Sequence, residues 1–188
     1  AEQLLSLEKW GRYLDIDGDG ICYRTLSGTH PTKGSFFTRG TSRDEFARYT
    51  EEGEPYVRNM DRLIKKWNTA KGYVPAPEFY QDKKSSPLGI IFFGTSTAST
   101  LEAVDLLAAE GIQLDAMRLR AFPFPESVRD FINAHEFVYV VEQNRDAQMR
   151  SLLINELDAT PQKLISVLNY DGFPITAEII RQHILDHL

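Results

Sequence analysis

The chain has 188 residues and a formal net charge of −6, with 42% hydrophobic and 11% aromatic residues. This acidic balance excludes nonspecific nucleic-acid binders, which need a basic surface to displace phosphate counterions. No apolar run approaches the roughly 20 residues that cross a bilayer, so we expect a folded protein that does not span a membrane.

The amino end has neither the basic flank nor the apolar stretch of a signal peptide, and the single Cys22 cannot form an internal disulfide. We therefore expect a cytoplasmic location. One cysteine cannot supply the thiolates that hold an iron–sulfur cluster, and no Cys or His spacing is typical of a zinc site. Any cluster is thus expected on a partner.

Two features open the chain. Apolar residues recur at Leu4, Leu7, Trp10 and Leu14 as they do toward the end of a helix, which predicts that the domain of this helix lies upstream. Residues 15–20 (DIDGDG) place carboxylates at alternate positions before a glycine, as an EF-hand calcium loop does. Leu26 stands where that loop requires glutamate. We therefore favour an acidic turn with hydrogen-bonded Asp side chains.

The most distinctive segment is residues 28–45 (GTHPTKGSFFTRGTSRDE), which continues a stretch without acidic residues from position 21 to position 43. Basic, glycine and hydroxyl residues interleave there, a composition that suits an anionic substrate or a carbonyl-lined interface. We expect five of these residues to lie close to a substrate or a subunit contact: His30, Thr32, Lys33, Arg39 and Arg43.

Two helices are predicted in the rest of this first part. Ser42 and Glu45 have the spacing of a capping box, which predicts a short helix starting there. Residues 55–71 form a longer helix with apolar residues on one face, at Val57, Met60, Leu63, Ile64 and Trp67. A segment with so little other regular structure does not pack alone, so we expect this face to lie against something absent from the chain.

The pattern changes after residues 83–87 (KKSSP), a polar stretch typical of a linker. Beyond it, apolar strand patterns at residues 89–93, 112–119, 137–141 and 164–168 alternate with helical patterns at residues 96–110, from 125, 149–157 and 175–184. The first of these helices is expected to turn one face to the sheet, with Ala98, Leu101, Val104 and Ala108. This alternation predicts a three-layer α/β/α domain with a mostly parallel sheet over residues 87–188, preceded by an irregular, partly helical segment over residues 1–86.

Two polar stretches fall at junctions between strands and helices. Residues 94–97 (GTST) open a helix, where hydroxyls cap more often than they receive an anion. No P-loop lysine or GxGxxG pattern supports nucleotide binding. Residues 142–146 (EQNRD) follow a central strand, at the edge where open α/β sheets bind ligands. Gln143, Asn144 and Arg145 are therefore either site residues or a polar loop with a helix cap at Asn144.

Long ordered strings resemble the α subunits of bacterial 2-oxoacid:ferredoxin oxidoreductases of the 2-oxoglutarate type. Residues 17–63 resemble the segment joining the first and second domains of those subunits. Residues 89–107, 119–125 and 137–153 resemble the domain that follows, which is similar to the C-terminal domain of transketolase. That fold implies a mixed five-stranded sheet with one antiparallel strand, and the fifth strand is expected near Tyr80. Cys22 departs from the pattern, since a proline is expected there.

The resemblance implies a thiamine-diphosphate enzyme that decarboxylates a 2-oxoacid, passes electrons through a [4Fe–4S] cluster to ferredoxin and releases an acyl-CoA. It implies that a β subunit carries the Mg2+–diphosphate motif and the cluster cysteines, and that an upstream α domain carries the activating carboxylate, in an α2β2 assembly. Residues 1–86 then comprise the end of the thiamine-type domain and an extended interface segment. We expect no catalytic residue and no metal ligand in this chain, and no activity from it alone.

Two other interpretations stay open. One is a stand-alone flavodoxin-like binding or regulatory module, which would bind a flavin or nucleotide tightly. The other is the equivalent domain of a pyruvate-specific oxidoreductase. The preferred 2-oxoacid is not indicated by these residues, because the resemblance places most of the substrate pocket elsewhere.

Overall fold

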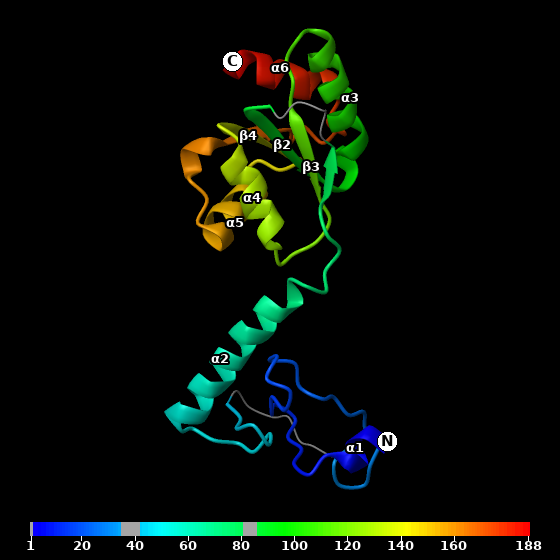
Figure 1. Ribbon diagram of the computed structural model, residues 1–188, viewed down its shortest axis with the longest axis vertical. Coiled ribbons are helices and arrows are strands. Elements are labelled where there is room, and N and C mark those ends of the chain that lie inside the picture. The colour runs from blue at the N-terminus through cyan, green and yellow to red at the C-terminus, as the bar shows by residue number, and fades with distance from the viewer. Residues whose placement is uncertain (1, 35–41, 81–85) are drawn as a thin grey trace. The chain divides into compact units, whose positions relative to one another are not determined.

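The computed structural model describes residues 2–34, 42–80 and 86–188 (Figure 1). Arg39 lies outside these ranges. The chain divides into two compact units, Ala1–Tyr73 and Val74–Leu188, each described by itself. Among the described residues, no helix combines the length and apolar character that crossing a membrane requires.

The second unit is built on a five-stranded sheet in the order β1-β3-β2-β4-β5. Its strands are β1 (Glu78–Tyr80), β2 (Leu88–Phe93), β3 (Asp115–Leu119), β4 (Phe137–Glu142) and β5 (Leu164–Leu168). β1 runs antiparallel to β3, with Phe79 opposite Met117, and the other strands run parallel, with Ile90 opposite both Ala116 and Tyr139. The four predicted strands are confirmed, and the antiparallel fifth strand lies at Tyr80, as the resemblance implied.

Helices cover both faces of this sheet (Figure 1). α3 (Thr97–Ala109) and α6 (Ala177–His187) lie on one face, and α4 (Glu126–Ala134) and α5 (Gln148–Leu157) lie on the other. Alternate residues of one strand serve the two layers: Ile90 and Phe92 belong to the core under α3 and α6, and Ile91 belongs to the core under α4 and α5. The predicted three-layer α/β/α fold is therefore confirmed.

The face that α3 turns to the core matches the predicted one in part: Leu101 and Val104 are partly buried and pack against the core. Its buried residues are Thr100, Ala103 and Leu107, whereas Ala98 is exposed. Thr100 is tolerated in the core because its Oγ1 donates to the carbonyl of Ser96 at 2.8 Å, which leaves its methyl group free to pack. The helix ends at Gly111 as expected. Gly111 has φ +88°, and its N–H and that of Ile112 bond back to the last turn.

The sheet unit starts earlier than the expected boundary at residue 87. β1 precedes that boundary, and its three residues are too few to show a strand period. Ser86, placed in the predicted linker, is tied to the sheet unit, because its Oγ donates to the carbonyl of Gln113 at 2.6 Å and its N–H donates to Asp115.

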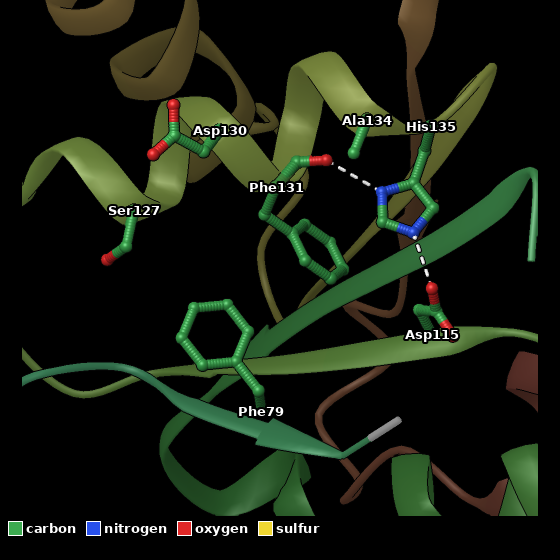
Figure 2. Close-up of a pocket in the computed structure, with 7 residues that line it drawn as sticks. All are labelled: Phe79, Asp115, Ser127, Asp130, Phe131, Ala134 and His135. Carbon is green, nitrogen blue, oxygen red and sulfur yellow. Dashed lines mark hydrogen bonds and ion pairs between the residues drawn. The ribbon is translucent and has the colours of Figure 1, made fainter. Parts of the chain in front are cut away.

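Asp115 and His135 form a buried pair at the start of β3 (Figure 2), with 2% and 3% exposure. Nδ1 of His135 lies 2.6 Å from the carbonyl oxygen of Phe131, and Nε2 lies 3.1 Å from Oδ2 of Asp115. A carbonyl can only accept, so Nδ1 carries a proton. The contact with Asp115 then needs a second proton, on the imidazole or on the carboxyl group. His135 is therefore a packing residue that joins the end of α4 to β3.

The first unit is organised by α2 (Gly53–Ala70), and a short α1 (Glu2–Ser6) lies at its start. The polar face of α2 holds the acidic turn: Arg62 donates to the carbonyl of Gly20 at 3.1 Å, and Thr69 donates to that of Asp19. Asp19 Oδ1 accepts from the N–H of Ile21 at 2.8 Å, which confirms the hydrogen-bonded acidic turn. Gly20 has φ +81°, and a Cβ there would lie 2.3 Å from the backbone nitrogen of Lys66, so this close approach requires glycine.

The opposite face of α2 is apolar and exposed in the described structure. None of the residues of α2 is buried. The predicted apolar stripe leaves large side chains open to water: Val57 at 55%, Met60 at 37%, Leu63 at 43%, Ile64 at 62% and Trp67 at 42%. Helices of globular proteins normally bury such a stripe and expose their polar face, so the polarity of α2 is inverted.

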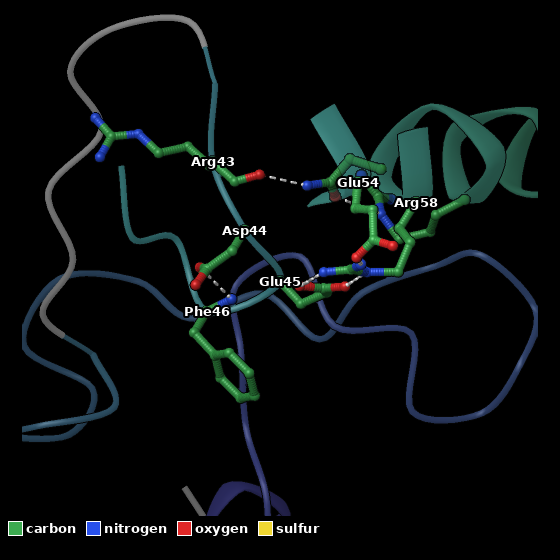
Figure 3. Close-up of polar contacts among 8 residues, drawn as sticks. Arg43, Asp44, Glu45, Phe46, Glu54 and Arg58 are labelled. Atoms are coloured by element: carbon green, nitrogen blue, oxygen red, sulfur yellow. Dashed lines mark hydrogen bonds and ion pairs between the residues drawn. The ribbon is translucent and has the colours of Figure 1, made fainter. Parts of the chain in front are cut away.

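The capping box predicted at Ser42 and Glu45 is wrong, because no helix starts there. Asp44 instead closes a turn, with its Oδ1 accepting from the N–H groups of Phe46 at 2.9 Å and Arg48 at 2.8 Å. Glu45 pairs with Arg58 of α2 (Figure 3). The hydrogen bond from Arg58 holds the pKa of Glu45 below its ordinary value.

Removing one partner of the buried pair should destabilise the sheet unit. We expect Asp115→Ala to lower the free energy of unfolding by about 3–5 kcal/mol, because His135 then keeps a buried polar nitrogen without its hydrogen-bond partner. Urea denaturation of the chain measures this change. Asp130→Ala is the matched control, an exposed carboxylate lining the same pocket. It should change stability by no more than about 0.5 kcal/mol. A loss below about 1 kcal/mol in Asp115→Ala would contradict the role of the pair.

The contact between Glu45 and Arg58 predicts a pH dependence in the first unit. Because the pKa of Glu45 is lowered in the folded chain, its stabilising contact is present above its ordinary pKa of 4.5 and is lost as the pH falls through the lower folded pKa. Carbon-detected NMR titration should show this pKa rising toward its ordinary value in Arg58→Met. The pKa of Glu110, lowered by Arg181 in the other unit, should stay lowered. An unchanged pKa of Glu45 in the variant would refute the contact.

Candidate functional site at the carboxyl edge of the sheet

The chain reverses direction across the sheet at β2. It crosses from β2 to β3 on one side of β2 and then returns to β4 on the other side. The two crossover helices, α3 and α4, lie on opposite faces. Loops leaving the carboxyl ends of β2 and β4 therefore diverge, and such a switch point is where open α/β sheets form ligand crevices.

A cavity of about 510 Å³ lies at this edge. It is lined after β2 by Thr95, after β4 by Gln143, and after β5 by Asn169, Tyr170, Gly172, Phe173 and Pro174. None of these side chains carries a charge. Small-molecule sites are typically concave, mostly apolar and of similar volume, with a few convergent polar groups. The cavity has this composition.

Gln143 joins the three loops that surround the cavity. Its Nε2 donates to Oγ1 of Thr95 at 2.8 Å, and its Oε1 accepts from the N–H of Ile175 at 3.2 Å. Oγ1 of Thr95 acts as acceptor here, so this contact does not use its hydroxyl proton. Gln143 thus holds the wall of the cavity in one arrangement.

Asn144 and Arg145, which were predicted together with Gln143, do not line the cavity. Oδ1 of Asn144 accepts from the N–H groups of Asp146 at 3.1 Å and Gln148 at 3.3 Å, so Asn144 closes the turn that leads into α5, whose N-cap residue is Ala147. Arg145 is 74% exposed and pairs with Asp146. The structure therefore brings one of the three predicted residues to the cavity.

Glu142 holds this loop in place through hydrogen bonds. Its carboxylate is 1% exposed and accepts from the N–H groups of Met149 at 2.7 Å and Arg150 at 2.9 Å, and from Nδ2 of Asn144 at 2.8 Å. The first two donors belong to the first turn of α5. Negative charge is favourable at a helix amino end, so Glu142 fastens α5 to the sheet edge.

The loop after β5 exposes two aromatic side chains that were not among the predicted site residues. Asn169 donates to Oδ1 of Asp171 at 3.1 Å and to the carbonyl of Phe173 at 3.0 Å, and the N–H of Phe173 donates to Oδ1 of Asp171 at 2.9 Å. These bonds fix the loop, yet Tyr170 is 65% exposed and Phe173 is 75% exposed. The signal was a DG turn with an aromatic residue on either side, directly after a strand.

The predicted capping of α3 by the hydroxyl groups at its start is wrong. Ser96 Oγ donates to the carbonyl of Phe93 and Thr97 Oγ1 donates to that of Gly94, both at 2.8 Å. No side-chain hydrogen bond caps the amino end of α3. The hydroxyls instead tighten the turn between β2 and α3.

Three of the predicted interface residues meet in one turn of the first unit. Nδ1 of His30 accepts from the N–H groups of Thr32 at 3.2 Å and Lys33 at 3.1 Å. Lys33 Nζ donates to the carbonyls of Leu4 at 3.0 Å and Leu7 at 3.1 Å, around the end of α1. These side chains are therefore engaged with the backbone of their own chain.

Arg43 is outside that turn and forms an isolated antiparallel bridge with Tyr49. Its Nη1 donates weakly to the carbonyl of Ala47 at 3.4 Å, and its guanidinium carbon lies 5.9 Å from the centroid of the Tyr49 ring. Its Nε is buried without a hydrogen-bond partner in the described part of the chain.

The pocket beside the buried pair has no catalytic arrangement (Figure 2). Ser127, Asp130, Asp115 and His135 all line this cavity of about 370 Å³. Both ring nitrogens of His135 are engaged, so the ring offers no free base to Ser127. Within the ranges that the structure describes, no three His, Cys, Asp or Glu side chains are grouped so as to hold a metal ion.

Comparison with known proteins shows relatives of one kind. No family model matches the chain. The 2-oxoacid:ferredoxin oxidoreductase subunit alpha of Saccharolobus solfataricus is 27% identical over 149 residues, which cover 77% of this chain and 23% of that protein. The 2-oxoacid:ferredoxin oxidoreductase 2 subunit alpha of Aeropyrum pernix is 26% identical over 171 residues, which cover 87% of this chain and 25% of that protein. The chain spans about a quarter of the length of these relatives.

A solved structure shares the fold. It is 2-oxoglutarate:ferredoxin oxidoreductase from Magnetococcus marinus with 2-oxoglutarate, coenzyme A and succinyl-CoA bound. The two superpose with a TM-score of 0.81 at 22% identity, over 96% of this chain and 31% of that one. Over most of its length, this chain is therefore a relative of the α subunits of 2-oxoacid:ferredoxin oxidoreductases, as the sequence resemblance predicted.

Proposed function

We propose that this chain is the part of a 2-oxoacid:ferredoxin oxidoreductase α subunit that holds the assembled enzyme together, and that the enzyme is of the 2-oxoglutarate type. The whole enzyme converts the 2-oxoacid and CoA to an acyl-CoA and passes the electrons to ferredoxin, in a reducing cytoplasm. The 2-oxoglutarate assignment is supported by the substrate named for the Magnetococcus marinus structure.

The exposed apolar face of α2 is the observation that carries this proposal. The polar face of α2 is occupied by the loops of its own unit, so this helix cannot turn over to bury its apolar stripe without releasing them. Burying one large apolar side chain contributes about 1.5–3 kcal/mol. Five such side chains in one stripe are a strong drive to associate, and patches of this kind mark interaction sites. We assign the stripe to contact with another part of the enzyme, from the β subunit or the rest of the α subunit.

The residues of this chain do not fit the cofactors of such an enzyme. A [4Fe–4S] cluster needs several thiolates, and the sequence contains one cysteine. In the acidic turn, the Gly20 carbonyl accepts from Arg62, and Asp15 pairs with Lys65 at 3.4 Å, so α2 engages oxygens that a cation would need. We propose that thiamine diphosphate, Mg2+, the cluster and CoA are held by the partner β subunit and the other α domains, in an α2β2 assembly that ferredoxin visits.

The segment around residues 28–45 is proposed to lie near the interface. His30, Thr32 and Lys33 shape its turn from within, so their effect on a substrate or partner is indirect. Arg43 is the better candidate for a direct contact, because its buried Nε has no partner among the described residues. A carboxylate or carbonyl from a neighbouring subunit would satisfy it.

The stand-alone flavodoxin-like module has one observation in its favour, the cavity at the switch point. The exposed stripe of α2 counts against it, because a protein that acts alone rarely leaves a continuous apolar face in water. If the chain is the equivalent domain of a pyruvate-specific enzyme, only the substrate of the whole enzyme differs. The kcat/KM values for 2-oxoglutarate and pyruvate distinguish the two.

The chain expressed alone should be inactive. With thiamine diphosphate, Mg2+, CoA and an artificial electron acceptor, we expect no oxidation of 2-oxoglutarate or pyruvate by residues 1–188, since the groups that hold the reacting cofactor lie elsewhere. The complete enzyme assayed in parallel is the control, and its kcat/KM should be higher for 2-oxoglutarate than for pyruvate. Turnover by the chain alone would overturn the assignment as part of a subunit.

Charging the apolar stripe of α2 should break assembly. We expect Ile64→Glu, made in the complete α subunit, to prevent association with the rest of the enzyme, because a carboxylate would be buried without a partner. Ala98→Glu adds the same charge at an exposed position of α3, in the other unit, and should assemble normally. Size-exclusion chromatography with light scattering measures the assembly, and thermal unfolding of the isolated chain should be alike in both variants. Normal assembly of Ile64→Glu would contradict the proposal.

A further inference from the structure

The cavity at the carboxyl edge of the sheet has features that an assembly role does not require. We propose that it binds the uncharged planar ring of a nucleobase, which stacks on Tyr170 and Phe173 and accepts hydrogen bonds from Thr95 and Gln143. Three observations lead to this class of ligand: fixed exposed aromatics, spare donors in the wall and no charge in the lining.

The aromatic side chains are held ready for a flat partner. An exposed Phe is costly in water, and a flexible loop would fold it inward. The backbone of Phe173 is held in place, because its N–H donates to Asp171 and its carbonyl accepts from Asn169. Gly172 has φ +89°, which completes this tight turn. Since the loop is already ordered, a ring that stacks there loses little affinity to ordering. Stacking on aromatic side chains tolerates any base, because every base has a π face.

The polar wall offers donors. The hydroxyl of Thr95 accepts from Gln143, so its own proton can be donated to a ligand. The amide of Gln143 has two N–H groups, and the contact with Thr95 uses one of them. A ligand that matches this wall carries acceptors at its edge, as the ring nitrogens and carbonyl oxygens of nucleobases do.

The lining also restricts the charge of the ligand. None of the seven lining residues is charged. Arg145, on the neighbouring loop, is outside the cavity and already pairs with Asp146. A phosphate would therefore find no cationic side chain inside, and the part of the ligand that is recognised should be the base. Binding should thus depend little on ionic strength.

The test is titration of the whole chain with adenosine, guanosine, uridine and CoA, followed by amide chemical shifts in NMR. We expect saturable binding of at least one nucleoside, with shifts confined to the amides around residues 94–96, 143 and 169–175. Phe173→Ala should weaken binding about tenfold or more, since one stacked base is worth about that much. Thr95→Val, which keeps the shape and removes the hydroxyl, should weaken it severalfold. If CoA binds no more tightly than adenosine, the base is the only part of the ligand that is recognised.

Tyr73→Ala is the matched control, because Tyr73 is 78% exposed and lies in the other unit. It should leave binding unchanged, and thermal unfolding should show that all three variants are folded. Equal binding of ribose 5-phosphate and adenosine would mean that an anion is held at the start of α3, and would overturn the proposal. No nucleoside binding at millimolar concentration would also overturn it. So would chemical shifts of these amides that change only when a partner subunit is added. These outcomes concern the isolated chain and are independent of enzyme assembly.

Discussion

The buried carboxylate of Glu142 is the constraint on which the loops at the carboxyl edge of the sheet depend. A carboxylate that is 1% exposed has lost its water, and it is stable there because three N–H donors and the amino end of α5 replace that water. The backbone carbonyl of the same residue accepts from the N–H of Asn169 at 3.0 Å. One residue at the end of β4 thus anchors the loop before α5 and the loop after β5.

The arrangement of the loops around the cavity depends on these hydrogen bonds of Glu142. Because the start of α5 is fixed, Asn144 can close the turn before it, and the adjacent Gln143 reaches Thr95 and Ile175. Because Asn169 is fixed, the turn through Asp171 and Phe173 closes with its aromatic side chains outside. The cavity is therefore a rigid feature formed by three loops, with Tyr170 and Phe173 at its surface.

The first unit is governed by a different constraint, the inverted polarity of α2. Its loops contain little regular structure, and they are held by polar side chains of one helix face, such as Arg62 and Thr69. Such contacts compete with water and contribute modestly when exposed. The apolar face that would normally supply the core is turned outward. The same arrangement therefore orders the loops of this unit and leaves its apolar stripe exposed.

The sequence by itself determined the layered fold of the second unit. Apolar runs such as residues 89–93 and 137–141, separated by helical periods, allow few arrangements other than a parallel sheet covered on both faces. It also indicated the edge that holds the cavity, since ligands bind at the carboxyl ends of such strands. The apolar stripe of α2 was likewise predicted from its period, and its large side chains are exposed in the described part of the first unit.

Only the tertiary structure decided how individual side chains are used. Asn144 and Gln143 are neighbours with similar chemistry, yet one closes the turn before α5 and the other lines the cavity, because their directions depend on where α5 and the loop after β5 lie. Tyr170 and Phe173 belong to the loop after β5, a strand that pairs with β4 although a helix separates the two in sequence. Glu45 has the spacing of a cap and instead meets Arg58, since Asp44 captures the N–H groups that a helix would need. Local patterns specify which backbone forms are accessible. Side-chain roles are settled by contacts between segments far apart in the chain, which no local pattern contains.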